Sequence, residues 1–425
     1  MMDYKSLSDD DLLALLKAKE TEYSQLNSLQ NAAKTALNSL YGACGNKHFR
    51  YFNSSIAEGI TQTGQVIIQY ISNSINSFLG KQLNMQGTDF IIANDTDSAY
   101  IELVALVEKV CGDIPPAKIV DFIDKFSAKF LMPFIDSEFV RLSDYLNFVG
   151  NHISMKREVI ADKAIWRGKK NYVIQVWDNE GVRYSEPDLK CVGVEAVRSS
   201  TPKIAKDALK VGYDILLNGT QEALLQHVKD FKETFMKAEM VRVAFPRGVS
   251  DMDKWFDKHT MWKVGTPIHV KACISYNHLL DKTGLGKTHV AIHNGNKIKF
   301  IYLKEPNPTG NNCIAFIDEL PAGFGLNSYI DMNTQFDKVF LSPLKSFAEL
   351  VGWDVVKVSR LDDLFSDEPL ITHVDVPVTI APEKTVSTPV IAKRKPENRT
   401  PNEPKAYAPK PSRIKKKPDL TSLFE

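Results

Sequence analysis

An α+β fold is predicted by two patterns in the sequence and by the order in which they occur. Apolar residues recur at spacings of three and four over long stretches, which is typical of amphipathic helices. Separate runs of β-branched and aromatic residues flank short polar turns, which is typical of β-hairpins. The two patterns do not alternate as strand–helix–strand units, so we expect helices beside antiparallel sheet rather than a doubly wound parallel sheet.

The first predicted element is a helix over 8–41, because leucines at 12, 13, 15 and 16 open an apolar face that continues to Leu40. Gly42 and Gly45 are expected to end it. The other elements follow in chain order: a helix at 56–79, a hairpin at 89–104, helical segments at 117–147, strands at 165–195 with a turn at Asn179-Glu180-Gly181, a helix at 199–217 with a Ser/Thr cap and a proline in its first turn, strands with Gly and Pro turns at 260–320, and mixed helix and loop at 335–365.

Composition narrows the class of protein. The chain has 425 residues, 43% of them hydrophobic, and 53 Lys and Arg against 52 Asp and Glu. A net charge of +1 excludes a uniformly basic nucleic-acid coat, but it can hide opposed regions. None of the five cysteines forms a Cys-x-x-Cys pair, and no stretch reaches the roughly 18 apolar residues of a membrane helix. We therefore expect a soluble intracellular protein with two or three globular units.

The last 60 residues differ from the rest of the chain. They hold 10 of the 21 prolines and 11 Lys and Arg against 8 Asp and Glu, a net charge of +3. Such a segment buries too little apolar surface to offset its chain entropy, so 366–425 is predicted to be a disordered tail.

Three short constellations are candidates for chemistry. Lys34, Asn38 and Tyr41 are spaced four and three apart, so they share one helical face that suits a phosphate, a sugar and a stacked base. A solvated stripe is the simpler interpretation of this motif taken alone.

The second constellation is Asp95-Thr-Asp97-Ser, at the tip of the predicted hairpin. Two carboxylates two residues apart repel each other, and a divalent cation such as Mg²⁺ relieves this repulsion. An ordinary turn also favours Asp, Thr and Ser. Taken alone, this tetrapeptide is more often a turn than a metal site, but the apolar flanking strands would hold the turn rigidly and so raise the odds of a metal site.

The third constellation is Trp166-Arg-Gly-Lys169-Lys170-Asn-Tyr172, a basic cluster that leads into a strand. It suits contact with a phosphate backbone, or it is merely a charged strand end, and local evidence leaves the two about even. Two further motifs are rejected. Gly284–Thr288 lacks the first glycine of a phosphate-binding loop and is predicted to be a turn between strands, and His289 and His293, in a strand-like segment, lack the glutamate of a zinc protease.

Taken in order, these motifs resemble family B DNA polymerases, most closely those of T-even bacteriophages. The resemblance covers roughly 8–365. It is carried by K-x-x-x-N-S-x-Y-G at Lys34–Gly42, D-T-D-S at 95–98, K-K-x-Y at Lys169–Tyr172, E-x-x-x-S-S-T-P-K at Glu195–Lys203, and the segments 304–316 and 361–365.

The resemblance implies a partial polymerase right hand: fingers at 1–46, palm at 47–193 and thumb at 194–365. It implies template-directed DNA synthesis with two Mg²⁺ ions, bound by Asp97 with Asp95 beside it. Its implied substrates are primer-template DNA and deoxynucleoside triphosphates (dNTPs), and its implied location is the cytoplasm of the infected bacterial host. The other implied roles are nucleotide binding by Lys34, Asn38 and Tyr41, primer-strand binding by Lys169, Lys170 and Tyr172, and a palm carboxylate of unassigned role at Glu158.

Several family features are missing. The sequence lacks the upstream element with the second metal-binding aspartate, the exonuclease carboxylates and the first finger helix. Asn94 stands where the family has glycine, and since Asn tolerates left-handed dihedrals, the turn is expected to survive. Asn171 replaces a basic residue and is expected to weaken the primer grip slightly. We therefore expect the C-terminal part of a split polymerase, with metals shared with an N-terminal polymerase/exonuclease chain. The alternatives are a non-catalytic DNA-binding and clamp-docking subunit, or an artificial truncation.

Two similar peptides are predicted to dock on a sliding clamp. Relatives carry a short apolar-aromatic peptide at the position of the first, and the second repeats its Leu-x-x-Leu-Phe spacing. That spacing places the three side chains on one face of a helical turn. The residues are Leu361, Leu364 and Phe365 in the first copy and Leu420, Leu423 and Phe424 in the second, which we expect to be the working copy.

Overall fold

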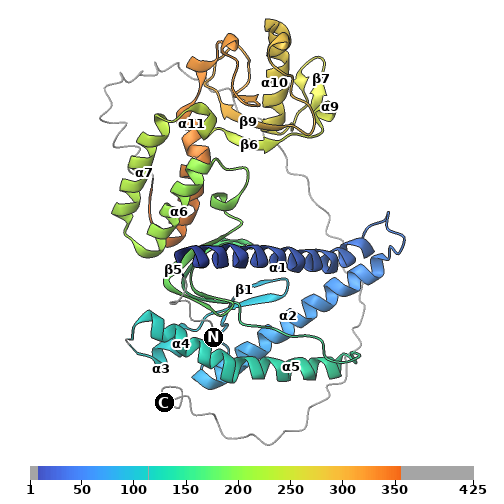
Figure 1. Ribbon diagram of the computed structural model, residues 1–425, viewed down its shortest axis with the longest axis vertical. Helices are drawn as coiled ribbons and strands as arrows, with labels where there is room; N and C mark the ends of the chain where they lie inside the picture. The colour runs from blue at the N-terminus through green and yellow to red at the C-terminus, as the bar shows by residue number, and fades with distance from the viewer. Residues whose placement is uncertain (1–7, 113, 356–425) are drawn as a thin grey trace, which may run out of the picture. The chain divides into compact units, whose positions relative to one another are not determined.

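Two long helices open the fold. The computed structural model describes residues 8–112 and 114–355 (Figure 1). Helix α1 spans Asp9–Cys44 and α2 spans Ser54–Leu83. The Ser8 side chain caps α1 by accepting a hydrogen bond from the Asp11 backbone N–H. The helix passes through Gly42, where an end was predicted, and stops at Cys44 with Gly45 as its cap.

The apolar face predicted for α1 is present, but none of the described residues buries it. No residue of α1 is buried, whereas the second half of α2 is anchored by Ile71, Ile75 and Leu79. The large apolar side chains of α1 that are exposed, with the exposed fraction of each, are Leu13 (63%), Leu16 (56%), Tyr23 (72%), Leu26 (59%), Leu29 (68%), Leu37 (73%), Leu40 (62%) and Tyr41 (45%). Within the described residues, this apolar face is therefore open to solvent.

A small hairpin and a group of helices follow α2. Strands β1 and β2 pair antiparallel, and α5 packs on α2. The elements are β1 (Ile91–Asp95), β2 (Ser98–Ile101), α3 (Val104–Val110), α4 (Pro116–Phe126), the π-helix η2 (Ser127–Leu131) and α5 (Met132–Tyr145). The core between these elements is apolar, with Phe126 and Phe139 fully buried.

A three-stranded antiparallel sheet occupies the middle of the chain. Its strands are β3 (Val159–Gly168), β4 (Asn171–Asn179) and β5 (Val182–Val192), with β4 in the centre. The central strand is the most buried of the three, which agrees with the apolar run predicted there. The predicted turn at Asn179-Glu180-Gly181 joins β4 to β5.

The remaining part of the fold combines a helical layer with a second three-stranded sheet in the order β10-β9-β6. Helix α6 packs against α7 and α12, and α10 packs against β10 (Figure 1). The elements are η3 (Glu195–Val197), α6 (Lys203–Asn218), α7 (Gln221–Met236), α8 (Met240–Val243), β6 (Phe245–Gly248), α9 (Met252–Trp255), β7 (Phe256–Asp257), β8 (Met261–Trp262), α10 (Ile268–Thr283), η4 (Leu285–Lys287), β9 (Lys297–Tyr302), β10 (Cys313–Phe316), η5 (Ala322–Phe324), η6 (Asn327–Tyr329), α11 (Met332–Phe336), the π-helix η7 (Asp337–Leu341), α12 (Ser342–Ala348) and η8 (Glu349–Val351).

The strand-rich expectation for 260–320 is wrong at 268–283, which forms α10. This segment contains β-branched residues and a tyrosine, but it packs against β10 and buries much of its length, and packing outweighs local propensity. Pro267 and Gly284, taken as turn residues, bound the helix instead. The segment from Gly284 to Lys287 is thus a turn after a helix, and His289 and His293 lie in the loop that follows.

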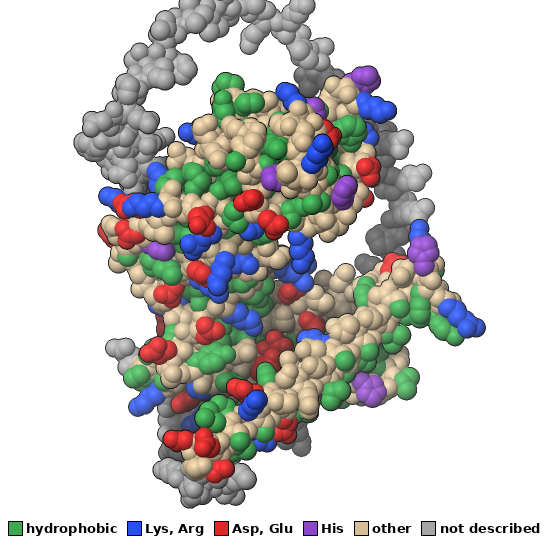
Figure 2. Space-filling view, turned by 45° about the horizontal axis from the view of Figure 1, so that its top comes forward, with side chains coloured by type: hydrophobic (Ala, Val, Ile, Leu, Met, Phe, Trp, Pro, Cys, Tyr) green, Lys and Arg blue, Asp and Glu red, His purple; other side chains and the backbone are tan. Residues whose placement is uncertain are grey.

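The expected side-chain cap of α6 is also absent, because Pro202 itself occupies the N-cap position. The mixed helix and sheet confirm the α+β prediction. No helix in the described ranges is long and apolar enough to cross a membrane. Acidic and basic side chains are interspersed on the face drawn in Figure 2, as a net charge of +1 suggests. Local clusters, rather than net charge, must therefore define any charged site.

Candidate active site

The D-T-D-S motif forms the tip of the β1–β2 hairpin. Asp95 pairs with Ser98, which leaves Thr96 and Asp97 as the two loop residues. The Asp97 backbone N–H donates to the Asp95 carbonyl at 2.6 Å. The Asp97 side chain is exposed, whereas that of Asp95 is 28% exposed. Asp97 is therefore the carboxylate of this pair that is more open to solvent.

The turn does not bend where the sequence indicated. Asn94 lies in β1 opposite Ala99, and the left-handed residue is Thr96, with φ of 55°. Left-handed backbone is unfavourable for a β-branched residue, so the hairpin tip is strained. Asn94 has a different use, because its side-chain oxygen accepts a hydrogen bond of 3.3 Å from Ser72 on α2.

A second contact fixes the base of the hairpin to α2. The Asn76 side chain donates to Asp89 at 2.7 Å and accepts from the Phe90 backbone N–H at 2.8 Å. Ser72 and Asn76 are four residues apart on α2, so both face the hairpin. Sequence reasoning missed these positioning residues, although two polar side chains at helical spacing beside an apolar stripe were a usable signal.

Lys169 and Lys170 form the two-residue turn between β3 and β4, where Gly168 pairs with Asn171. The Lys170 side-chain Nζ lies 3.2 Å from Asp95 Oδ1, so this turn meets the D-T-D-S hairpin. Gly193 supports the turn from behind, since a Cβ there would lie 1.9 Å from the Lys170 carbonyl oxygen. Two predicted constellations are thus brought together.

Tyr172 is 6% exposed and does not face solvent. Its hydroxyl contacts the Tyr100 hydroxyl, and its ring stacks on Trp166 at 5.1 Å between centroids. Burial raises the pKa of Tyr172, and the contact with Tyr100 and the nearby charges of Asp95 and Glu158 raise it further. The side chain is therefore a neutral packing element that joins the two sheets, at the position predicted to grip a primer.

Lys34, Asn38 and Tyr41 lie on α1 and are all exposed. Within residues 8–112 and 114–355, no hydrogen bond or ion pair joins them to the hairpin. Their shared face agrees with the predicted stripe, but the contacts of the described residues do not bring it to the carboxylates.

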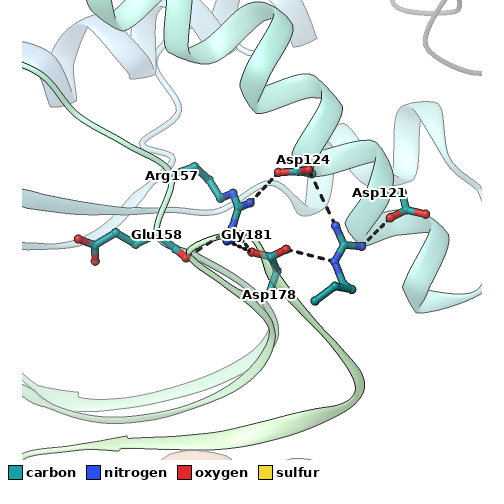
Figure 3. Close-up of polar contacts among 7 residues, drawn as sticks. Asp121, Asp124, Arg157, Glu158, Asp178 and Gly181 are labelled. Carbon is teal, nitrogen blue, oxygen red and sulfur yellow. Dashed lines mark hydrogen bonds and ion pairs between the residues drawn. The ribbon is translucent and has the colours of Figure 1, made fainter. Parts of the chain in front are cut away.

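Glu158 is exposed and borders a charge network that the sequence did not indicate (Figure 3). At its centre is Asp178, which is 1% exposed and pairs with Arg157 and with Arg183 at 3.2 Å. Arg157 also pairs with Asp124 at 2.7 Å and Arg183 with Asp121 at 2.6 Å, so α4 is tied to the sheet. Burial alone would raise the pKa of Asp178, but the hydrogen bonds from Arg157, the Gly181 N–H and Arg183 outweigh it, and the net pKa is lowered.

A cavity of about 390 Å³ lies between α2 and α5, but its charged groups already have partners within the protein. Its buried carboxylate, Glu138, accepts hydrogen bonds from Tyr70 at 2.9 Å and Ser74 at 3.2 Å and pairs with Arg141 at 2.7 Å. Because Glu138 already has three partners, we interpret it as a carboxylate that stabilises the packing of α2 on α5 rather than as a catalytic group.

The hairpin fits part of a Mg²⁺ site. Carboxylate oxygens are the ligands that Mg²⁺ prefers, and Asp97 is open to solvent. However, the described residues contain no group of three or more His, Cys, Asp or Glu side chains that could hold a metal ion. Within the described residues, the hairpin therefore contributes two carboxylates, those of Asp95 and Asp97, to any such site. The predicted clamp peptides, with Leu361, Leu364, Phe365, Leu420, Leu423 and Phe424, lie outside the described residues.

Comparison with known proteins identifies the family. Residues 12–112 match the family model for DNA polymerase family B. Over 378 residues the chain is 34% identical to the DNA-directed DNA polymerase of Enterobacteria phage T4, which covers 85% of this chain and 41% of that protein. It is 32% identical over 381 residues to the corresponding enzyme of Escherichia phage RB69, with the same coverage, and 23% identical over 379 residues to DNA polymerase 1 of Aeropyrum pernix. The chain spans 41% of the length of the two phage relatives. The chain therefore carries a segment of DNA polymerase family B and is similar over most of its length to T-even-type members of that family.

Proposed function

We propose that the chain is the C-terminal subunit of a DNA-directed DNA polymerase that copies phage DNA in the cytoplasm of an infected bacterium. The observation that carries the proposal is the meeting of the Asp95–Asp97 hairpin with the Lys169–Lys170 turn through the 3.2 Å ion pair. A carboxylate pair beside a basic turn suits DNA synthesis, because carboxylates can hold the metal ions and lysines can hold the phosphates of the primer backbone.

The chemistry assigned to each residue follows from its exposure. Two Mg²⁺ ions, when bound, supply the charge that stabilises phosphoryl transfer. Asp97 would hold metal with its open carboxylate, and Asp95 would shape the same site. Lys169 and Lys170 would contact the primer backbone. Lys170 is 60% exposed and its ion pair with Asp95 is a surface pair worth only about 0–1 kcal/mol, so a phosphate can replace Asp95 as its partner.

Tyr172 would position this turn from within the packed cluster rather than touch DNA. On α1, Lys34 would neutralise the triphosphate of the incoming dNTP, while Asn38 and Tyr41 would contact its sugar and base. Glu158, exposed near Tyr172, would be an accessory carboxylate. In this proposal fingers (1–46), palm (47–193) and thumb (194–365) are contributed by this chain.

An N-terminal polymerase/exonuclease chain would complete the enzyme. Two observations support this partner: the described residues offer too few ligands for a metal pair, and α1 exposes an apolar face along much of its length. Contiguous exposed apolar surface marks interaction sites, and full burial of each leucine stabilises by about 1.5–3 kcal/mol. The phage relatives also contain residues beyond the part that this chain matches.

Primer extension tests the proposal. The chain is mixed with the N-terminal segment of a T-even-type polymerase, and extension of a labelled primer is measured with Mg²⁺. We expect extension by the mixture and none by either part alone. Asp97→Ala should lower the rate roughly a thousandfold or more, since a lost metal ligand removes several kcal/mol of charge stabilisation. Asp136→Ala, an exposed aspartate on α5, is the matched control and should leave the rate unchanged.

The second candidate is a non-catalytic subunit that binds DNA and docks on the clamp. The observation that favours it is that the described residues contain no group of three or more His, Cys, Asp or Glu side chains that could hold a metal ion. Normal extension by the Asp97→Ala mixture would support this candidate and exclude Asp97 as a metal ligand.

Clamp docking is a separate part of the proposal. We assign it to Leu420, Leu423 and Phe424, with Leu361, Leu364 and Phe365 as the alternative peptide. Processive synthesis with a sliding clamp is compared after deletion of 420–425 and after Leu364/Phe365→Ala. Loss of processivity in the second variant alone would transfer the role to the 361–365 copy.

A further inference from the structure

Helix α1 carries an apolar stripe that repeats every seven residues. Its two rows are Leu16, Tyr23, Gln30 and Leu37 and, three residues further on, Lys19, Leu26, Ala33 and Leu40. Two such rows, offset by three and four residues, are the pattern by which one helix pairs with another in a left-handed coiled coil. Six of these eight positions are apolar, so the stripe is suited to pairing with a second helix.

The stripe is large enough for a stable interface. Eight large apolar side chains of α1 are between 45% and 73% exposed, and all of them lie in the two rows or directly beside them. A partner can cover about 100 Å² of apolar surface on each such side chain, which gives about 800 Å² for the eight. This is roughly the area that each partner contributes to a standard protein–protein interface.

Charge along α1 is divided between its two halves. Residues 9–26 hold five carboxylates and two lysines, a net charge of −3, whereas residues 27–50 hold Lys34, Lys47 and Arg50 and no carboxylate, a net charge of +3. Two copies of α1 that run in the same direction would place like charges together. Two copies that run in opposite directions place the acidic half of each beside the basic half of the other, and their helix dipoles also attract. The surface is therefore complementary to itself in the antiparallel orientation.

We propose that α1 binds α1 of a second copy of this chain, in an antiparallel dimer with twofold symmetry. Such an interface is isologous, so one surface serves both copies. Successive registers differ by seven residues, and one of them overlaps the whole stripe. It places Leu16 against Leu40 of the second copy, and Tyr23 against the small Ala33 of the second copy. Leu29 then meets Leu29 of the second copy beside the symmetry axis.

The same register brings opposite charges together beside the stripe. Glu20 lies next to Lys34 of the second copy, and the symmetry repeats this pair. Neither side chain has an ion-pair partner among the described residues, so the new pair breaks no existing one. The polar residues within the rows, Lys19 and Gln30, specify a register at a cost in stability, so we expect a Kd on the order of 1 µM. Below that concentration the chain is monomeric, and its free energy of unfolding does not include this contact.

The dimer and the proposed enzyme use the same face of α1. A second copy on this face excludes an N-terminal chain from it and covers Lys34 and Tyr41, which are candidate nucleotide-binding residues. The dimer is therefore a resting form that the N-terminal chain must displace. This regulatory role rests on the proposed function, whereas the dimer itself does not.

Sedimentation velocity of the full chain over roughly 0.1–100 µM measures the self-association. The wild type should pass from monomer to dimer near 1 µM, on the order expected above. Leu29→Glu removes two apolar contacts and places two like charges beside the axis, so it should weaken the dimer at least roughly a hundredfold. Ser28→Glu adds the same charge to an exposed residue on the outer side of α1, and this matched control should stay within about twofold of wild type.

Charge exchange tests the orientation. Glu20→Lys and Lys34→Glu each place like charges together and should weaken the dimer about tenfold at low salt, whereas the double variant should restore it. A chain that stays monomeric throughout the range would overturn the proposal. An unchanged dimer of Leu29→Glu, or no restoration in the double variant, would overturn it as well.

A competition experiment tests the shared face. Adding the N-terminal segment of a T-even-type polymerase should convert the dimer into a complex with one copy of each chain, and a complex that retains two copies of this chain would overturn the resting-form role. Primer extension by the mixture stays an independent test. Extension with a chain that never dimerises would refute the dimer alone, and a dimer without extension would refute the polymerase assignment alone.

Discussion

Replacing Asp178 should destabilise the chain more than replacing any exposed aspartate. The Asp178 side chain is 2% exposed and neutralises two guanidinium groups, those of Arg157 (18% exposed) and Arg183 (33% exposed). Removing one partner of a buried ion pair costs about 3–5 kcal/mol, because the remaining charge stays buried without a counterion. Both arginines retain a second partner on α4 and some solvent, so we expect Asp178→Ala to lie at the lower end, about 3 kcal/mol at pH 7.

Equilibrium urea unfolding followed by tryptophan fluorescence measures this loss. Asp162→Asn, an exposed aspartate on β3 of the same sheet, is the matched control and should stay within about 0.5 kcal/mol of wild type. The pKa of Asp178 is lowered in the folded chain, so its contribution is complete above its unfolded pKa of about 3.9 and is lost as the pH falls through the lower folded pKa. The gap between wild type and Asp178→Asn should therefore shrink below about pH 4. A cost under 1 kcal/mol for Asp178→Ala at pH 7 would refute the reasoning.

Three further predictions concern the hairpin, the lysine turn and α1. Gly193→Ala should destabilise the chain by at least about 1–2 kcal/mol and shift the Lys170 turn, because its φ is +66° and the added Cβ would meet a carbonyl at 1.9 Å; unfolding and hydrogen exchange at this turn measure both effects. Thr96→Gly should stabilise the chain by up to about 1 kcal/mol in the same unfolding assay, by relieving the left-handed strain, and a loss would show that the turn is not strained. Leu37→Ser with Leu40→Ser should leave the isolated chain within about 0.5 kcal/mol of wild type, yet weaken binding to the N-terminal chain at least tenfold, as measured by calorimetry; equal binding would place the partner elsewhere.

The element types were predictable wherever local pattern and tertiary packing agree. Helices α1 and α2 and the β1–β2 hairpin follow from periodicity and turn residues alone. Helix α10 was missed, because its buried residues include the consecutive run from Ala272 to Tyr276, which hides the helical period, and it is packed against β10. The exposure of the apolar face of α1 could not be predicted either. An amphipathic pattern indicates that a face prefers burial, but it does not indicate whether the same chain covers that face.

The candidate site, too, could be predicted only in part. Sequence motifs found the Asp95–Asp97 hairpin and the Lys169–Lys170 turn as separate features, and the 3.2 Å ion pair joins them across 75 positions of the chain. The side chains that hold this arrangement come from elsewhere: Asn76 from α2 and Gly193 from the end of β5. Such residues belong to no sequence motif, because their role depends on a contact with a residue that is distant in the sequence. The same is true of a cavity of about 350 Å³ whose four cationic lining residues, Arg167, Arg198, Arg247 and Lys338, come from separate parts of the sequence.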